Sequence, residues 1–385
     1  MKYNLNHEEI REAVSKLCEN FPGSYWQELD KHQSYPEKFV RALTEAGYLS
    51  ALIPEQYGGL SLPISAGAAI LEEIHKSGCN AAACHAQMYT MGTVLRFGSE
   101  QQKEKFLPKV ANGSLRLQAF GVTEPTSGTD TTSLKCTAKK EGNNYIVNGQ
   151  KIWTSRAEHS DLMLLLARTT PKDKVVKKTD GLSVFLVEMK NVPKETLTIK
   201  PIKTMMNHST TEIFFDNMPV PKENLIGEEG KGFKYILSGM NAERILIAAE
   251  CIGDAKWFIN KSTKYSSERI VFGRPIGKNQ GIQFPISRSY SQMRAAELML
   301  NEAIRLFDKG ENPGEEANLA KLLCADASWM AAEACVQTHG GFGFAEEYDV
   351  ERKFREARLY QVAPISTNLI LSYISEHILG MPRSY

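Results

Sequence analysis

The sequence predicts an α+β protein in which helical N-terminal and C-terminal domains flank a central β domain. Apolar residues recur at helical spacing up to about residue 115, in short strand-sized runs from 116 to 222, and again at helical spacing beyond that point. The chain has 385 residues, which is roughly two to three times the usual size of one domain. We therefore expect three domains, over residues 1–115, 116–222 and 223–385.

The N-terminal segment carries the apolar spacing of amphipathic helices. Phe39, Leu43 and Ala46 recur at intervals of three and four residues, which places them on one face of a helix. Pro54 and Pro63 then interrupt the pattern, because proline cannot continue a helix. We expect a helical domain with breaks at these prolines.

The central segment has strand-length apolar runs bounded by turn residues. The runs cover residues 145–147, 162–167, 182–187 and 212–215. Asn148 and Gly149 follow the first run, and this dipeptide is common in tight hairpin turns. The middle of the chain is therefore predicted to be a β domain.

Long helical patterns return after Pro221, with breaks at residues 310–314 and 340–343. The second break is rich in glycine but does not follow a strand in a βαβ unit, so we do not interpret it as a dinucleotide-binding fingerprint. We expect these glycines to end a helix.

The composition argues against polyanion and membrane binding. Lys and Arg number 46 against 45 Asp and Glu, so the net charge of +1 gives no global field that nucleic acid could follow. No apolar run reaches the roughly 18 residues that cross a bilayer. The N-terminus lacks the basic, apolar and small-residue regions of a signal peptide. We expect a cytoplasmic protein that binds neither nucleic acid nor membrane.

The cysteines give no sign of disulfides or of a metal centre. There are seven, an odd number without paired spacing, so we expect reduced thiols that are mostly buried. Cys79, Cys84 and His85 lie close in sequence, but no second ligand cluster with zinc-like spacing follows them. No metal site is predicted.

Two adjacent charges interrupt an apolar helical stripe that runs from Phe233 to Cys251. Glu243 and Arg244 fall in the gap of this stripe, where loss of hydration costs several kcal/mol per ion. Such charges need a partner or a chemical role. The pattern alone permits a buried salt bridge to another helix as well as a catalytic carboxylate.

A polar loop follows the first predicted strand of the β domain. Residues 121–130 read GVTEPTSGTD, combining glycines with hydroxyl side chains. Such a loop can present N–H and O–H donors to a polar ligand, although it is also compatible with an ordinary turn.

Five motifs in order resemble the acyl-CoA dehydrogenase family, and the resemblance covers essentially the whole chain. The motifs are IPEQYGG at 53–59, GVTEPTSGTD at 121–130, NGQKIWTS at 148–155, ERIVFGRPIGKNQ at 268–280 and QTHGGFGF at 337–344. The resemblance implies a helical N-terminal domain, a central β-barrel-like domain and a C-terminal four-helix bundle. It also implies a homotetramer with non-covalent FAD between the β domain and the bundle.

The resemblance further implies a set of FAD-binding residues. One group would flank the isoalloxazine ring or cover its opposite side, namely Phe120, Val122, Thr123, Trp153 and Ser155, with Thr129 near the pyrophosphate and the CoA entrance. A second group would reach the FAD pyrophosphate and adenosine of a neighbouring subunit, namely Arg269, Phe272, Gln280, Gln337 and Gly341. Ser366 and Asn368 occupy positions that also touch FAD in the family.

The sequence departs from the family at the usual catalytic base. In much of the family this base is a glutamate after a Tyr-Gln segment, but Pro364 stands at that position here. Proline has neither a carboxylate nor an N–H to donate to the thioester carbonyl. Branches that resemble isovaleryl-CoA and long-chain dehydrogenases carry the base in a Glu-Arg helix motif, which Glu243 and Arg244 match. We predict Glu243 as the base and Arg244 as a contact of a CoA phosphate.

The implied reaction is α,β-dehydrogenation of an acyl-CoA to the trans-2-enoyl-CoA, with electrons passed to an electron-transfer flavoprotein. Residues 83–91 lie where the family lines its acyl pocket, and Ile365 would fill space near the thioester. The same scaffold permits a flavin monooxygenase or oxidase, or a dehydrogenase of acyl groups tethered to a carrier protein. A flavin-binding scaffold that lost its activity with Pro364 is a further alternative.

Overall fold

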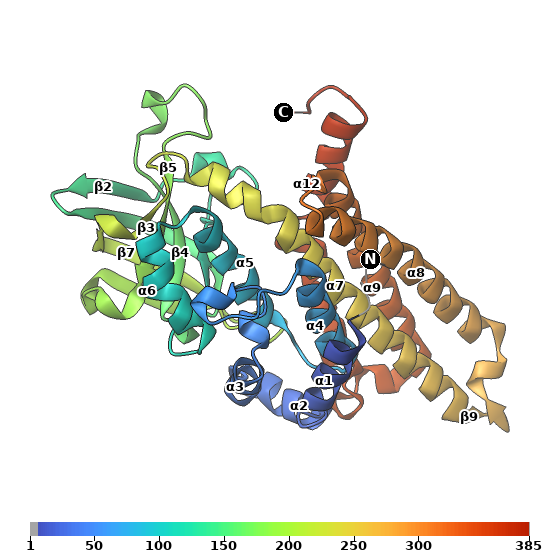
Figure 1. The fold of residues 1–385 in the computed structure, drawn as a ribbon. Coiled ribbons are helices and arrows are strands. Elements are labelled where there is room, and N and C mark those ends of the chain that lie inside the picture. The colour runs from blue at the N-terminus through green and yellow to red at the C-terminus, as the bar shows by residue number, and fades with distance from the viewer. Residues whose placement is uncertain (1–6, 385) are drawn as a thin grey trace. The chain divides into compact units, whose positions relative to one another are not determined.

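The computed structural model describes residues 7–384, and its N-terminal part is helical (Figure 1). Ser99 caps α6 by accepting a hydrogen bond from the backbone N–H of Gln102, whose side chain reaches back to the Ser99 N–H. In α4, residues 64–75 are all buried. The helices are α1 (Glu8–Cys18), α2 (Gly23–Lys31), α3 (Glu37–Glu45), α4 (Ile64–Lys76), α5 (Ala82–Phe97) and α6 (Glu100–Ala111).

The middle of the chain forms an eight-stranded sheet. Seven strands follow the order β6-β7-β3-β2-β4-β5-β8, and β1 pairs in parallel with β4. The longest pairing joins β3 to β7 in antiparallel register. The strands are β1 (Leu117–Gly121), β2 (Thr137–Glu141), β3 (Asn144–Ser155), β4 (Leu162–Arg168), β5 (Leu182–Glu188), β6 (Leu197–Pro201), β7 (Thr210–Pro221) and β8 (Leu225–Ile226).

Both faces of β4 are buried, because its alternating side chains enter two different cores. Leu162, Leu164 and Leu166 pack with residues of α5 and α6, whereas Met163 and Leu165 pack with residues of β2, β3, β5 and β7. Strands that are not neighbours in the sheet thus share one core, so the sheet curves around it. This curvature is consistent with the barrel-like character expected of the domain.

Long helices follow the sheet (Figure 1). A short hairpin of β9 (Ile270–Val271) and β10 (Arg274–Pro275) separates α7 from α8, and α8 lies beside α9. The helices are α7 (Gly232–Glu268), α8 (Gln280–Asp308), α9 (Gly314–His339), α10 (Val350–Ala357), α11 (Leu359–Val362) and α12 (Thr367–Tyr373). The predicted order of helical, β and helical parts is confirmed.

The chain divides into two compact units that do not follow the three sequential segments. The first unit joins residues 7–32 and 63–81 to residues 241–384, and the second unit contains residues 33–62 and 82–240. Helix α7 begins in the second unit and continues into the first. The boundaries at 115 and 222 remain predictions.

All seven cysteines are buried and none of them forms a disulfide. Within residues 7–384, no helix is both long and apolar enough to cross a membrane. Within the same range, His, Cys, Asp and Glu side chains form no group of three or more with the geometry to hold a metal ion.

Candidate functional site

The polar loop at 121–130 is anchored by a buried ion pair in the second unit. Lys151 of β3 is fully buried, and its ammonium lies 2.9 Å from Glu124 Oε1 while donating to the Val122 carbonyl at 2.9 Å. The Glu124 carboxylate also accepts from the backbone N–H groups of Lys135 and Cys136, at 2.7 and 2.9 Å. Each buried charge is thus compensated by several hydrogen bonds. The ion pair fixes the loop against β3.

This anchor brings part of the predicted flavin-binding set together. The N–H of Ile152 donates to the carbonyl of Thr123 at 2.9 Å, so Val122 and Thr123 run beside the segment that leads to Trp153. Trp153 is 57% exposed and has a φ of 62°, a left-handed conformation that is uncommon outside glycine. A large exposed aromatic side chain at a strained position is typical of a functional surface.

The remaining predicted flavin-binding residues of the second unit are Phe120, Ser155 and Thr129. Phe120 is partly buried and packs against the core beneath the loop. Ser155 pairs with Thr210 at the end of β3. Thr129 is exposed on the loop. Sequence reasoning missed Lys151 and Glu124, although both lie inside the quoted motifs.

We predict that Lys151→Met destabilises the protein by about 3–5 kcal/mol, because it leaves the buried Glu124 carboxylate without its cation. The measurement is the free energy of unfolding from urea denaturation. The matched control is Lys139→Met, since Lys139 is exposed on β2. A loss below about 1 kcal/mol in Lys151→Met, equal to the control, would contradict this role for the pair.

In the first unit, the predicted base lies on the buried side of α7. Glu243 is 3% exposed. Arg244 is the next residue, and its guanidinium donates to Asn241 Oδ1 at 2.9 Å. Burial lowers the pKa of Arg244, while the negative charge of Glu243 opposes this shift. The structure thus supplies the desolvated carboxylate that the prediction requires, but it does not test the catalytic role.

A buried lysine holds the segment that contains Pro364. Lys321 of α9 is fully buried and donates to the carbonyls of Tyr360 and Ile365, at 2.5 and 2.7 Å. Burial lowers the pKa of Lys321, and Glu243 is among the charges that oppose this shift. The two carbonyls flank Pro364, so the ammonium fixes the backbone where the family usually places its base. Sequence reasoning missed Lys321, whose only signal was a cation within an apolar helix.

A buried ionic network connects α7 with α4 and α10. His75 Nδ1 lies 2.9 Å from Asp254 Oδ1, and Lys353 forms an ion pair with the same oxygen. The backbone N–H of Ala81 donates to His75 Nε2 at 3.1 Å, which assigns the ring proton to Nδ1. Burial alone would raise the pKa of Asp254, but Lys353 and His75 lower it to about 2.

We predict that this network weakens at acid pH through Asp254. The folded pKa of about 2 lies below the usual unfolded value of about 3.9, so the stabilisation is complete above that value and is lost as the pH falls toward 2. Between pH 6 and pH 3, Asp254→Asn should lose about 1 kcal/mol less unfolding free energy than the wild type. Urea denaturation measures this difference.

The control for this prediction is Glu311→Gln, which changes an exposed carboxylate of the same unit. Its loss of stability between the two pH values should equal that of the wild type. Equal acid sensitivity of Asp254→Asn and this control would contradict the role of Asp254 in the network.

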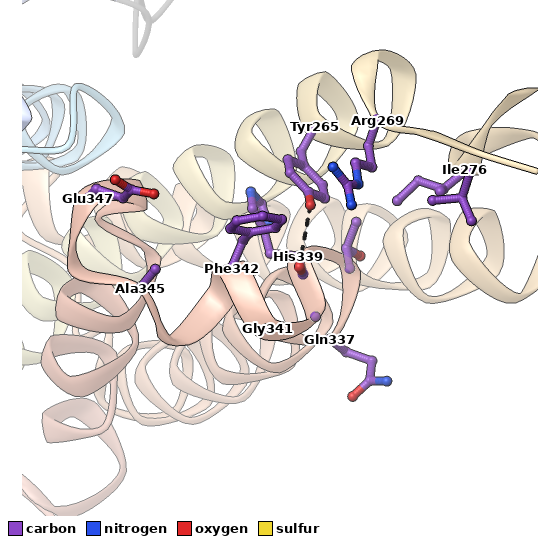
Figure 2. Close-up of a pocket in the computed structure, with 12 residues that line it drawn as sticks. Tyr265, Arg269, Ile276, Gln337, His339, Gly341, Phe342, Ala345 and Glu347 are labelled. Carbon is purple, nitrogen blue, oxygen red and sulfur yellow. Dashed lines mark hydrogen bonds between the residues drawn. The ribbon is translucent and has the colours of Figure 1, made fainter. Parts of the chain in front are cut away.

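A pocket of about 520 Å³ in the first unit gathers three of the predicted adenosine-side residues (Figure 2). Arg269, Gln337 and Gly341 line it. The Arg269 guanidinium lies 5.3 Å from the centre of the Phe342 ring, and the ring of Tyr265 stacks on that of His339 at 4.1 Å. Such a cation can pair with a phosphate group, and the aromatic rings and glycine backbone can pack against a flat base joined to that phosphate.

The other predicted residues of this unit lie outside the pocket lining. Phe272 is 99% exposed on the β9–β10 hairpin with a φ of 51°, and Gln280 is exposed at the start of α8. Ser366 caps α12 by accepting a hydrogen bond from the Leu369 N–H, and Asn368 is exposed. The structure therefore brings Arg269, Gln337 and Gly341 into one pocket lining, which does not include these four.

Family models match three consecutive parts of the chain. The N-terminal domain of acyl-CoA dehydrogenase matches residues 4–114, the middle domain matches 119–218 and the C-terminal domain matches 230–379. An acyl-CoA dehydrogenase of Bacillus subtilis is 35% identical over 355 residues, covering 91% of this chain and 92% of the relative.

The chain belongs to the acyl-CoA dehydrogenase family. It is therefore an oxidoreductase, as the resemblance predicted. A glutaryl-CoA dehydrogenase of Desulfococcus multivorans is 32% identical, with both chains fully covered. A chain from structural work on the electron transferring flavoprotein of Acidaminococcus fermentans superposes with a TM-score of 0.91 at 31% identity, covering 98% of this chain and all of that one. The position of the base and the roles of single residues remain predictions.

Proposed function

We propose that this chain oxidises an acyl-CoA thioester to the trans-2-enoyl-CoA, with Glu243 as the base and FAD as the cofactor. The observation that carries the proposal is a carboxylate 3% exposed on α7, in a chain whose usual base position holds Pro364. Glu243 and Arg244 match the Glu-Arg helix motif of one branch of the family. This motif and the burial together favour Glu243 over a purely structural ion pair.

The residues present fit FAD in both units. The pocket lined by Arg269 offers a cation for the pyrophosphate, and a Cβ placed on Gly341 would meet no atom within 4 Å, so there is room for a ligand. In the second unit, exposed Trp153 provides an aromatic surface for the isoalloxazine ring, and the anchored Thr123 provides a backbone edge for it. When bound, FAD supplies the acceptor for the β-hydrogen, which leaves as hydride.

Glu243 has the task of removing the proton from the carbon next to the thioester carbonyl. Loss of that proton to the carboxylate and of the β-hydrogen as hydride leaves the new carbon–carbon double bond. A buried carboxylate serves well as a base, because removal from water favours its protonated form and raises its proton affinity toward the working pH. Lys321 supports this step by holding the backbone on both sides of Pro364.

The test is anaerobic titration of the FAD-loaded protein with straight, branched and aromatic acyl-CoAs. We expect loss of the flavin absorbance with one substrate class. Glu243→Gln should slow this bleaching by about 10²–10⁴-fold at unchanged FAD content, because it removes a general base. Glu315→Gln changes an exposed carboxylate on α9 and should bleach like the wild type. Full bleaching by Glu243→Gln would refute the assignment.

We further propose an electron-transfer flavoprotein as the electron acceptor and a homotetramer as the assembly. The similarity to a chain from work on an electron transferring flavoprotein supports the first proposal. Exposed Phe272, which lies outside the pocket in its own chain, suits a contact with a second copy. Reoxidation of the reduced protein distinguishes the alternatives, since an oxidase or monooxygenase would react with air within seconds.

A further inference from the structure

Two buried cysteines meet in the first unit, where α1 packs against α4 (Figure 1). Cys18 is the last residue of α1, and Cys79 follows the turn that ends α4. Cys18 is 3% exposed and Cys79 is fully buried. The Cys79 sulfur lies 4.0 Å from the Cys18 carbonyl oxygen, and the two thiols are hydrogen-bonded to each other. Two sulfurs in direct contact have the proximity that a disulfide requires.

Two buried cations lie beside the backbone of Cys79. Arg352 donates to the carbonyl of Gly78 at 3.0 Å, and the Lys353 ammonium donates to the carbonyl of Cys79 itself at 3.4 Å. The hydrogen bond from Cys18 and the charges of these two cations lower the pKa of the Cys79 thiol, although burial opposes them. The hydrogen bond to Cys79 and burial raise the pKa of Cys18. Cys79 is therefore the thiolate of the pair, and Cys18 is the hydrogen-bond donor.

Four of the other cysteines lack this activation. Burial raises the pKa of Cys136 and of Cys335 to about 11, and it raises the pKa of Cys251 and of Cys324 well above the usual value. Cys251 and Cys324 are close enough for their charges to act on each other, so they are the rival pair. A neutral thiol reacts slowly with oxidants, because the thiolate is the nucleophile. An oxidant should therefore select the pair that contains Cys79.

The pair lies at a helix end, where local opening exposes buried groups. Helix termini open at a smaller free-energy cost than the core of a protein, and Cys18 is the last residue of α1. The ion pair that anchors α1 to α4, Arg11 with Glu72 at 2.9 Å, lies further toward the other end of the helix. A small oxidant can therefore reach the two sulfurs without global unfolding.

We propose that Cys18 and Cys79 form a redox-sensitive tether, which hydrogen peroxide closes to a disulfide between the end of α1 and the end of α4. The Cys79 thiolate attacks one peroxide oxygen, so that an S–O bond forms, the O–O bond breaks and the other oxygen leaves as water. The Cys18 sulfur then attacks the Cys79 sulfur, so that the S–S bond forms and the second oxygen leaves as water. The two thiol hydrogens leave in these waters, and the two electrons lost by the sulfurs reduce the peroxide. Neither cysteine belongs to the residues assigned to flavin or substrate, so the tether is independent of the proposed dehydrogenation.

The test maps disulfides in the folded, FAD-loaded protein after treatment with excess hydrogen peroxide. The remaining thiols are alkylated under denaturing conditions, and the non-reduced peptides are identified by mass spectrometry. We expect peptides linked through Cys18 and Cys79, about ten-fold or more in excess of any other linkage, and their separation by dithiothreitol. Absence of this linkage, or dominance of one between Cys251 and Cys324, would overturn the proposal.

Variants assign the roles of the two sulfurs. Cys18→Ser cannot form the disulfide, so Cys79 should accumulate as a sulfenic acid, which dimedone traps for mass spectrometry. In Cys79→Ser, Cys18 should remain a thiol, because the attacking thiolate is gone. Cys335→Ser is the matched control and should give the full yield of the linkage. Trapping of Cys18 in Cys79→Ser, without trapping of Cys79 in Cys18→Ser, would overturn the assignment. If either variant does not fold, the linkage map of the wild type decides.

The tether should also stabilise the folded protein. A disulfide between these cysteines closes a loop of about sixty residues, which restricts the unfolded chain. The oxidised wild type should therefore unfold at a higher urea concentration than the reduced wild type, whereas peroxide should give Cys18→Ser no such increase. A midpoint of the oxidised wild type at or below that of the reduced protein would contradict a disulfide that forms within the native fold.

Discussion

The proposed site depends on a carboxylate that is kept away from water on α7. Glu243 is buried on a helix whose stripe from Phe233 to Cys251 is apolar except at this residue and Arg244. The chain places two cations nearby, since Arg244 is adjacent and the charge of Glu243 acts on Lys321. A catalytic base needs both burial and nearby cations, because burial raises its proton affinity while the cations keep it ionised at the start of the reaction. The replacement of the usual base by proline makes this carboxylate the centre of the proposed chemistry.

The second unit also contains buried charges whose loss of hydration must be compensated by partners. Lys151 and Glu124 are buried together, and the pair is satisfied by backbone groups on both sides. Their position fixes the loop that carries Thr123 beside the segment of Trp153.

The sequence was sufficient for the fold class and the family, because periodicity reports local structure and the five motifs are each continuous stretches. It was also sufficient to single out Glu243, since a charge within an apolar helical stripe is visible without a structure. It could not reveal the role of Lys321, whose carbonyl partners lie about forty residues further along the chain. Phe272 and Gln280 were grouped with Arg269 by motif position, but neither residue lines the pocket of its own chain.

The most direct measurement of the central claim is exchange of the α-hydrogen with solvent. The FAD-loaded protein is incubated in D₂O with a 3-thia acyl-CoA, which has no hydrogen on the β atom to transfer, and deuterium at the α carbon is followed by mass spectrometry. We expect the wild type to incorporate deuterium and Glu243→Gln to incorporate none above the rate without protein. Exchange by Glu243→Gln at the wild-type rate would show that another group removes the proton.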